Sequence, residues 1–131
     1  MANIGIDHGT THSLVAVVLD GKARCLLDDD ERTLLPSAVR YNEQGEPISI
    51  GYPALDAAGQ PGGTTFTSVK RFMGRSAAEV ADEAKLFHYD LIEEDQKAVR
   101  FKVGDREVTP IEVSSFILRL LHSRAEECLF G

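Results

Sequence analysis

Apolar residues open the chain in short runs that end at turn-forming residues. Residues 3–7 predict a short strand, and the almost wholly apolar run 13–19 predicts a second strand that is buried on both faces. Asp20-Gly21 separates that run from residues 22–27, and an Asp-Gly pair favours a type I′ hairpin turn because both central positions need positive φ. The pattern therefore predicts three antiparallel strands at the start of the chain.

The middle of the chain alternates shorter apolar runs with glycine and proline. We expect, in order, two strands, a short helix and a loop at residues 37–41, 48–51, 53–58 and 59–65. Before them, residues 28–31 are consecutively acidic. No further spaced oxygen ligands follow, as a calcium loop requires, so this stretch predicts a solvated turn rather than a cation site.

Two helices are predicted in the rest of the chain, each opened by a capping box. Residues 76–79 (Ser-Ala-Ala-Glu) begin a helix that we expect to run to about residue 85, and residues 109–112 (Thr-Pro-Ile-Glu) begin a long amphipathic helix that extends nearly to Phe130. Between the helices the pattern predicts strands at residues 87–92, 99–103 and 106–108, the last two joined by a tight Gly-Asp turn. Because the chain stops just after a helix, we expect it to be the beginning of a longer protein.

The composition is typical of a single globular domain: the 131 residues are 43% hydrophobic and 27% charged. Fourteen Lys and Arg against 21 Asp and Glu give a net charge of −7, which argues against sequence-independent nucleic-acid binding. The longest apolar run, residues 14–19, is far too short to span a bilayer, and Asp7 and His8 interrupt the place of a signal peptide's apolar segment. We therefore expect a soluble, cytoplasmic protein with neither a membrane nor a nucleic acid as partner.

Two cysteines, Cys25 and Cys128, cannot form a disulfide framework, which agrees with a reducing compartment. We expect Cys25 on a strand with its side chain toward the core, and Cys128 in the last turn of the final helix. Neither has a convincing base nearby in the sequence, which argues against a nucleophilic role.

The segment 4–12 carries the main candidate chemistry. A strand ends in the carboxylate of Asp7, and Gly9, Thr10 and Thr11 follow before the next strand begins. Glycine lets a ligand approach the backbone, consecutive turn amides can bind an anion, and the threonines add hydroxyl donors, while Asp7 could hold a magnesium ion or its water shell. One interpretation is a phosphate clamp built on a hairpin, without the Gly-x-x-x-x-Gly-Lys pattern of a P-loop. The other is an ordinary turn, since Asp, Gly and Thr favour turns anyway.

Three segments together resemble the DnaK-type heat-shock chaperone ATPases, the heat-shock-70 family. Residues 4–17 are similar to that family's first phosphate motif, residues 35–37 (Leu-Pro-Ser) to a segment after its third strand, and residues 68–75 to its Lys-Arg-x-x-Gly-Arg segment. The order and spacing of all three agree, and the resemblance covers essentially the whole chain. Residues 34–37 and 67–76 look closest to the HscA branch, which serves iron–sulfur cluster assembly.

The resemblance implies an α/β fold of the actin-like (ribonuclease-H-like) ATPase kind, with two lobes and ATP in the cleft. This chain would be an incomplete version of that fold: the first strands of lobe I plus its outer α+β subdomain. Residues 1–39 and 109–131 would form the first part of the base subdomain, and residues 40–108 the outer one. The second phosphate loop, the adenosine site, the second lobe and the peptide-binding domain would be missing.

The resemblance also implies roles in ATP hydrolysis for residues at matching positions. Asp7 would approach Mg²⁺ through water, and the Thr10 hydroxyl would contact the γ-phosphate. Thr11 and His12 would offer backbone amides to the β-phosphate beside Gly9. Lys70 would lie across the cleft, near the γ-phosphate and the attacking water. Without the family match, a solvated surface lysine would be the better interpretation of that residue.

Histidines mark two departures from the family pattern. His8 stands where the family usually has leucine, and His12 where it has asparagine or tyrosine; a buried histidine beside Asp7 could lower phosphate affinity or make it pH-dependent. The His8-x-x-x-His12 spacing resembles a metal pair, but that spacing suits a helix and this segment is expected to be strand, turn and strand. We expect His88 and His122 to be ordinary surface or boundary residues.

The function implied is ATP-driven binding and release of a client, with the isolated chain inactive as an ATPase. A client polypeptide or an iron–sulfur scaffold would bind through the missing C-terminal domain, with a J-domain co-chaperone as a further partner. Two alternatives stay open. A sugar kinase or other actin-like ATPase also opens with an Asp-Gly-Thr hairpin but lacks the Lys70 segment at this position, and a non-catalytic interaction module would have a decayed cleft.

Two structural expectations complete the sequence analysis. The strand at residues 3–7, or its neighbours, should expose an unpaired sheet edge, which invites self-association. Arg71 and Arg75 are expected to form structural ion pairs, because carboxylates are abundant in the chain.

Overall fold

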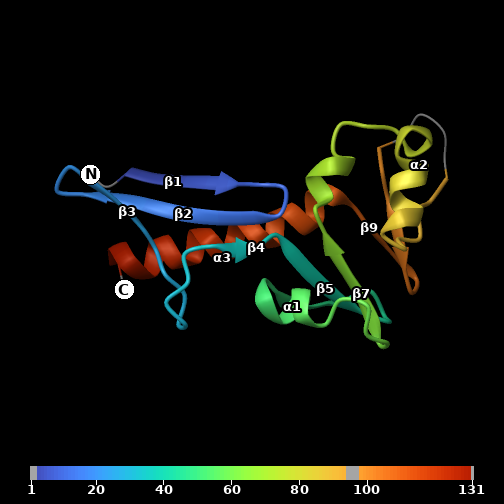
Figure 1. The fold of residues 1–131 in the computed structure, drawn as a ribbon, viewed down its shortest axis with the longest axis horizontal. Coiled ribbons are helices and arrows are strands. Elements are labelled where there is room, and N and C mark those ends of the chain that lie inside the picture. The colour runs from blue at the N-terminus through green and yellow to red at the C-terminus, as the bar shows by residue number, and fades with distance from the viewer. Residues whose placement is uncertain (1–2, 94–97, 131) are drawn as a thin grey trace.

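The computed structural model describes residues 3–93 and 98–130, in which small β-sheets and short helices surround one long helix (Figure 1). In chain order the elements are β1 (Asn3–His8), β2 (His12–Leu19), β3 (Lys22–Cys25), β4 (Leu35–Pro36), β5 (Ala38–Asn42), β6 (Pro47–Ile50), α1 (Tyr52–Asp56), β7 (Gly63–Thr67), the 3-10 helix η1 (Val69–Phe72), α2 (Ala77–Leu86), β8 (Phe101–Val103), β9 (Arg106–Val108) and α3 (Pro110–Phe130). In this described part of the chain, no helix combines the length and the apolar character that crossing a membrane requires.

The first sheet contains β1, β2 and β3 in that order, all antiparallel, and the short β4 also pairs with β2. Asp20 and Gly21, between β2 and β3, have φ values of 52° and 76°, as a type I′ turn requires. The prediction of three opening strands is confirmed, although the third ends at Cys25. Among the described strands, β1 pairs only with β2 and residues 3–7 are exposed, so the expected open sheet edge is present.

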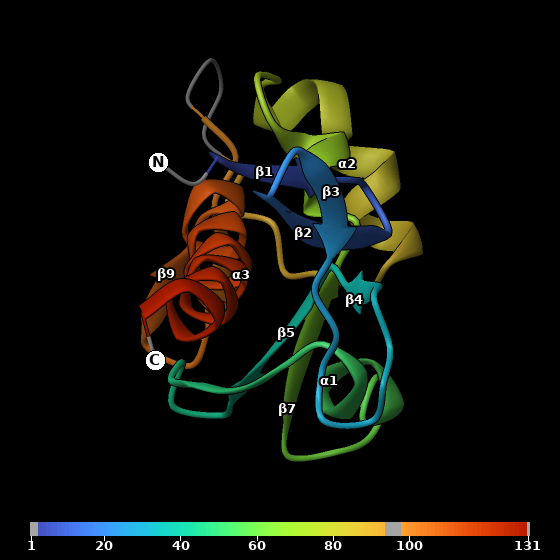
Figure 2. The same cartoon turned by 90° about the vertical axis from the view of Figure 1, so that its left-hand side faces the viewer.

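Helix α3 lies along one face of this sheet, as both views show (Figures 1 and 2). The hydroxyl of Thr109 accepts the amide hydrogen of Glu112 at 3.1 Å, which is one of the two hydrogen bonds of the predicted capping box. The carboxylate of Glu112 accepts a 2.7 Å hydrogen bond from the Tyr41 hydroxyl, which ties α3 to β5. Four fully buried residues form the apolar stripe of the helix: Val113, Ile117, Leu121 and Ala125. Each of the larger ones contributes roughly 1.5–3 kcal/mol by its burial.

The second sheet has β5 at its centre, between β6 and β7, and α1 packs against it. The strands expected at residues 37–41 and 48–51 are confirmed to within one residue, and the short helix begins at Tyr52. The loop expected over residues 59–65 is wrong in its second half, because β7 begins at Gly63 and pairs with β5. The β-branched threonines of β7 favour a strand and outweigh the glycine signal.

An aromatic cluster joins β7, η1 and β8 and forms the core of the outer part of the molecule. Ring centroids within this cluster lie 4.8 to 5.9 Å apart, in tilted or edge-to-face arrangements, and its members are Phe66, Phe72, Tyr89 and Phe101. Such pairs add about 0.5–1.5 kcal/mol each beyond the buried area. The cluster therefore fixes η1, which precedes α2 in the chain, against the second sheet.

Helix α2 begins with the predicted capping box, in which Ser76 and Glu79 bond to each other's backbone amide, and it ends one residue beyond the expected position. The strand predicted at residues 87–92 is wrong. After the helix, His88 adopts a left-handed conformation with φ 60°, and the rings of Phe87 and Tyr89 stack at 5.4 Å. Their apolar character therefore serves the aromatic cluster rather than a strand.

The strand predicted at residues 99–103 is shortened to β8, and its hairpin into β9 is confirmed. Before it, Leu91 forms a single isolated bridge to Phe101. Residues 94–97, between the two strands that the sequence predicts here, lie outside the described residues.

The environment of Cys25 differs from the expectation that it faces the core. It is exposed, because β3 lies at the edge of the first sheet and all four of its residues are exposed. Cys128 lies in the last turn of α3, as predicted, and is exposed too. The acidic stretch forms the predicted turn, in which one carboxylate oxygen of Asp28 accepts the amides of Asp30 and Arg32.

Candidate functional site

The turn between β1 and β2 is tight because Gly9 approaches the opposite strand closely. The amide of Gly9 donates to the carbonyl oxygen of His12 at 3.0 Å, which closes the hairpin. A Cβ atom added to Gly9 would overlap that same carbonyl oxygen, so only glycine fits here without a shift of the backbone. The requirement for glycine at position 9 is therefore steric and does not depend on any ligand.

Most backbone carbonyl groups of this turn accept hydrogen bonds from the protein itself. The donors are Lys70 Nζ to His8 O at 2.6 Å, Ser37 Oγ to Gly9 O at 3.0 Å, the Ser37 amide to Thr11 O at 2.8 Å, and the Gly9 amide to His12 O at 3.0 Å. Negative ends of the peptide dipoles are thus turned toward the protein. Of the amides of the turn itself, only that of Gly9 donates in these bonds.

The amides of Thr10 and Thr11 donate to no other group in the part of the chain that the structure describes. Thr11 is exposed and Thr10 is half-buried, so both lie within reach of solvent. Consecutive turn amides without a protein acceptor form an anion-binding concavity of the kind that suits phosphate oxygens. The hydroxyl of Thr11 lies 3.2 Å from Nδ1 of the exposed His12, while the Thr10 hydroxyl has no described partner.

Lys70 is brought to this turn by the short 3-10 helix η1. Val69 and Phe72 are each 1% exposed and anchor the helix in the core, so Lys70 and Arg71 project outward. The turn into η1 passes through Ser68, which has φ 54°. Residues 62 positions apart in the sequence thereby meet, with the ammonium group 2.6 Å from the carbonyl oxygen of His8. A full positive charge therefore lies at the edge of the turn.

Asp7 is the last residue but one of β1, and its side chain is exposed. Since successive side chains of a strand point to opposite faces, Asp7 lies on the face opposite to His8, which contacts α3. Its carboxylate accepts no hydrogen bond from the described residues. An unshielded carboxylate beside open amides has the hard oxygen donors that Mg²⁺ prefers.

His8 is half-buried between the sheet and α3. Its Nδ1 lies 2.9 Å from Ser13 Oγ and its Nε2 lies 2.9 Å from Ser114 Oγ. Burial lowers the pKa of His8 first, and the positive charge of Lys70 lowers it further, against the opposing effect of Asp7. The ring is therefore held closer to its neutral form than an exposed histidine.

Sequence reasoning did not single out the buried serines around His8. Ser13 is 1% exposed, Ser37 2% and Ser114 4%. A signal for two of them does exist: Ser13 opens an apolar strand, and Ser114 lies on the buried stripe of an amphipathic helix. A polar side chain at such a position needs a hydrogen-bond partner, which here is His8.

The other polar residues named from the sequence make local contacts. Arg75 forms the expected ion pair with Glu83, at 2.7 Å, whereas Arg71 has no carboxylate partner among the described residues. His88 is exposed, and His122 lies 3.0 Å from Glu126 one helical turn away. No group of three potential metal ligands occurs in the described part of the chain.

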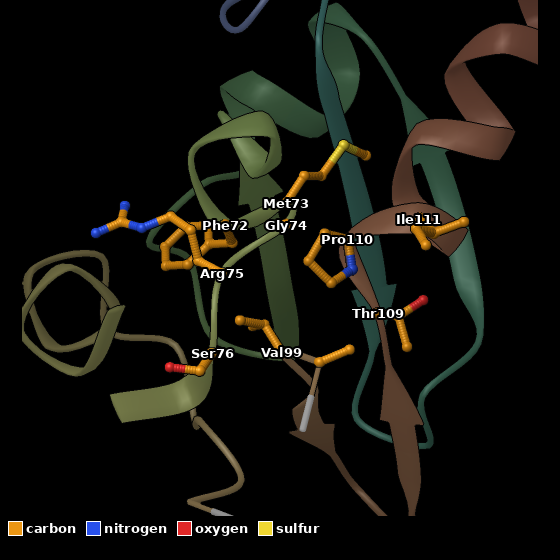
Figure 3. Close-up of a pocket in the computed structure, with 10 residues that line it drawn as sticks. Phe72, Met73, Gly74, Arg75, Ser76, Val99, Thr109, Pro110 and Ile111 are labelled. Carbon is orange, nitrogen blue, oxygen red and sulfur yellow. The ribbon is translucent and has the colours of Figure 1, made fainter. Parts of the chain in front are cut away.

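A cavity of about 630 Å³ lies between the segment after η1 and the start of α3 (Figure 3). Its walls are mainly apolar and include Met73, Val99, Pro110 and Ile111. None of its lining residues belongs to the β1–β2 turn. It is therefore separate from the polar site.

Comparison with known proteins shows which proteins the chain resembles in sequence. The family model described as "Hsp70 protein" matches residues 3–130. The chain is 48% identical over 128 residues to a "Chaperone protein HscA homolog" of Acidithiobacillus ferrooxidans and 45% identical over 128 residues to one of Variovorax paradoxus. It is 44% identical over 128 residues to the "Chaperone protein HscA" of Photorhabdus laumondii. Each match covers 98% of this chain and 20% of the relative, so the chain spans about a fifth of the length of these proteins.

Proposed function

The chain belongs to the Hsp70 family, and we propose that it supplies the first phosphate-binding elements of a chaperone ATPase. One observation carries this proposal: the turn carbonyls are bonded inward while the amides of Thr10 and Thr11 are open beside the ammonium group of Lys70. Neither feature is required to form an ordinary hairpin turn. The HscA names of the relatives favour a chaperone over the sugar-kinase alternative.

In this proposal the residues of the turn contact the β- and γ-phosphates of the nucleotide. The Thr10 hydroxyl, which has no described partner, binds the γ-phosphate, and the amides of Thr11 and His12 bind the β-phosphate beside Gly9. Lys70 places a compact charge near the γ-phosphate and the attacking water. This arrangement suits phosphoryl transfer, which depends mainly on positioning and on charge stabilisation around the phosphate oxygens.

Asp7 is the residue proposed to hold Mg²⁺, through a water molecule. Its exposed carboxylate accepts no hydrogen bond from the described residues, so its oxygens are free for a hydrated cation. When bound, the ion supplies charge that offsets the phosphate oxygens. The role of the chain itself is to hold the carboxylate near the end of β1, two residues before Gly9.

The proposed fold is the first part of an actin-like ATPase lobe. Residues 1–39 and 109–131 belong to the base subdomain in this proposal, and residues 40–108 to the outer one. Two observations support the division: α3 packs against the first sheet, and the second sheet shares its aromatic cluster with β8. The isolated chain is proposed to be inactive, because the second lobe and the adenosine site would lie elsewhere in the protein.

The proposed partners follow from the HscA relatives and from the resemblance to the cluster-assembly branch. A client polypeptide, or an iron–sulfur scaffold protein, would bind outside this chain, and a J-domain co-chaperone would be a further partner. A cytoplasmic location stays a prediction from the sequence.

ATP turnover by the full-length protein tests the proposal. Lys70→Ala is expected to abolish hydrolysis, whereas the neighbouring Arg71→Ala, which removes an outward charge from the same helix, should leave it within about twofold. Turnover would be measured at pH 6 and pH 8, with and without a peptide from an iron–sulfur scaffold. Peptide-stimulated hydrolysis that needs Lys70 supports the chaperone. Absence of nucleotide binding at both pH values would favour the non-catalytic module with a decayed cleft.

A further inference from the structure

The edge of β1 that faces away from β2 is defined by the hydrogen-bond pattern of the hairpin. In an antiparallel ladder, residues that bond to the partner strand alternate with residues whose backbone groups point away from it. The amide of Gly9 donates to His12, so the odd-numbered residues of β1 bond to β2. The N–H and C=O groups of Ile4, Ile6 and His8 therefore point outward.

Only part of this outward edge is occupied. Lys70 donates to the carbonyl oxygen of His8 at 2.6 Å, which is independent evidence that the even-numbered residues face outward. The N–H and C=O groups of Ile4 and Ile6 have no partner in the described part of the chain, where β1 pairs only with β2. Such a row of open backbone groups is a template for another strand.

The side chains along this edge are apolar and incompletely covered. Ile4 and Ile6 are 39% and 38% exposed, whereas Val17 and Val15, which lie opposite them on β2, are at most 1% exposed. Helix α3 covers β2 more fully than β1, and Leu118 of that helix is 37% exposed. Ile6 and Leu118 line one open cavity of about 470 Å³. The edge therefore offers apolar surface beside its open backbone groups.

We propose that this edge pairs with the same edge of a second copy of the 131-residue chain. The two strands run antiparallel, with Gly5 opposite Gly5 of the second copy. Ile4 then lies opposite Ile6 of the second copy, and each such pair exchanges two backbone hydrogen bonds. The contact is two-fold symmetric, so it closes at a dimer. It does not depend on the function proposed above.

The contact of Lys70 selects this register. A shift of two residues toward the turn would place Ile4 opposite His8, whose carbonyl oxygen already accepts the hydrogen bond from Lys70. A shift of two residues the other way would place Ile6 opposite residue 2, outside the described strand. A shift of one residue would exchange the two faces of the strand. Pairing about Gly5 is thus the register that uses all the open groups of Ile4 and Ile6.

The side chains on the other face of β1 complement each other in the same register. Asn3 lies opposite Asp7 of the second copy, so an amide donor faces a carboxylate acceptor. The carboxylate of Asp7 is exposed and accepts no hydrogen bond from the described residues. Because the contact is one short strand long and each copy has a net charge of −7, we expect a weak dimer, with a Kd of roughly 0.1–1 mM.

Sedimentation equilibrium of the 131-residue chain over about 0.02–2 mM is the first test, in buffer without Mg²⁺ because Asp7 is also the proposed cation ligand. We expect the apparent mass to rise from 14.3 kDa toward twice that value. Ile6→Pro removes an outward N–H and leaves the ladder with β2 intact, so it should raise the Kd at least about fivefold. Ile6→Val keeps that N–H and is the matched control. A parent chain that stays monomeric throughout, or an Ile6→Pro variant that pairs as tightly as Ile6→Val, would overturn the proposal.

Charge changes at Asn3 test the register, and they decide the matter even where Ile6→Pro does not fold. Asn3→Asp places like charges opposite each other and should weaken the dimer about three- to thirtyfold, whereas Asn3→Lys should tighten it by a similar factor. Gln44→Asp and Gln44→Lys, in the exposed turn between β5 and β6, change the net charge equally and should alter the Kd by less than about twofold. Asn3 variants that shift the Kd no more than the Gln44 variants would show that the register is wrong.

Hydrogen exchange locates the contact on the strand. The amides of Ile4 and Ile6 should become protected as the concentration of the chain rises, because only the second copy accepts their hydrogen bonds. The amides of Gly5 and Asp7 bond to β2 and should be protected at every concentration. If the chain dimerises while the exchange of Ile4 and Ile6 stays independent of concentration, the interface lies elsewhere and the proposal is wrong.

Discussion

Replacing Gly9 by alanine tests whether the β1–β2 turn depends on the close approach of two backbone segments. An added Cβ would overlap the carbonyl oxygen of His12, which belongs to a paired strand and cannot move alone. Relief of the overlap requires the turn to open, which breaks the 3.0 Å hydrogen bond between the Gly9 amide and His12. Gly5→Ala, in the strand β1 that leads into the turn, is the matched control, because its Cβ would meet nothing within 4 Å.

The expected loss of stability for Gly9→Ala is about 2–3 kcal/mol, from roughly 1 kcal/mol for the hydrogen bond and 1–2 kcal/mol for the steric overlap. At roughly 2.1 cal/mol/K per residue, the unfolding entropy of 131 residues converts this into a fall in Tm of about 7–11 °C by calorimetry. Gly5→Ala should change Tm by less than about 2 °C. Equal Tm values for the two variants would refute the close-approach argument.

Three further substitutions test the rest of the fold. Arg40→Met should lower the free energy of unfolding in urea by about 2–4 kcal/mol, because the buried guanidinium group donates to four oxygens in residues 57–65; a loss below about 0.5 kcal/mol would contradict this. Burial, and then Glu112, raise the pKa of Tyr41, so its contribution to stability is present below about pH 10 and is lost as the pH rises further. Urea unfolding between about pH 9 and 11 should therefore be less pH-dependent in Tyr41→Phe than in the parent. Ser76→Ala should cost about 1 kcal/mol by removing the cap of α2, and an unchanged urea midpoint would count against that cap.

The elements that the sequence predicts well are those with a strong local signal. The hairpin at Asp20-Gly21 needs positive φ values that its residue types favour, and both capped helices begin where their boxes stand. The errors fall where tertiary packing overrides a local pattern. Residues 87–92 are apolar because Phe87 and Tyr89 join the aromatic cluster, and residues 63–67 form a strand because β5 offers a partner.

The candidate site also has one part that the local sequence predicts and another part that depends on tertiary packing. Gly9, Thr10 and Thr11 are neighbours in sequence, so their chemistry is visible in the motif, and the Hsp70 match confirms the family to which that motif was attributed. The approach of Lys70 to His8 depends on how η1 packs, which no local pattern specifies. The buried serines that surround His8 come from β2, from the segment after β4 and from α3, so only the folded chain brings them together.

One turn of 3-10 helix divides its four residues between the hydrophobic core and the solvent. Phe72 contacts the rings of Tyr89 and Phe101, while Lys70, two residues earlier, bonds to the carbonyl oxygen of His8 at the β1–β2 turn. Any repacking around Phe72 would tilt this rigid turn and carry the ammonium group with it. Under the proposed function, the rate of ATP hydrolysis by the full-length protein would then depend on the packing of core residues that do not contact the proposed nucleotide site. A substitution such as Phe72→Leu could thus imitate a defect in chemistry while leaving every polar group in place.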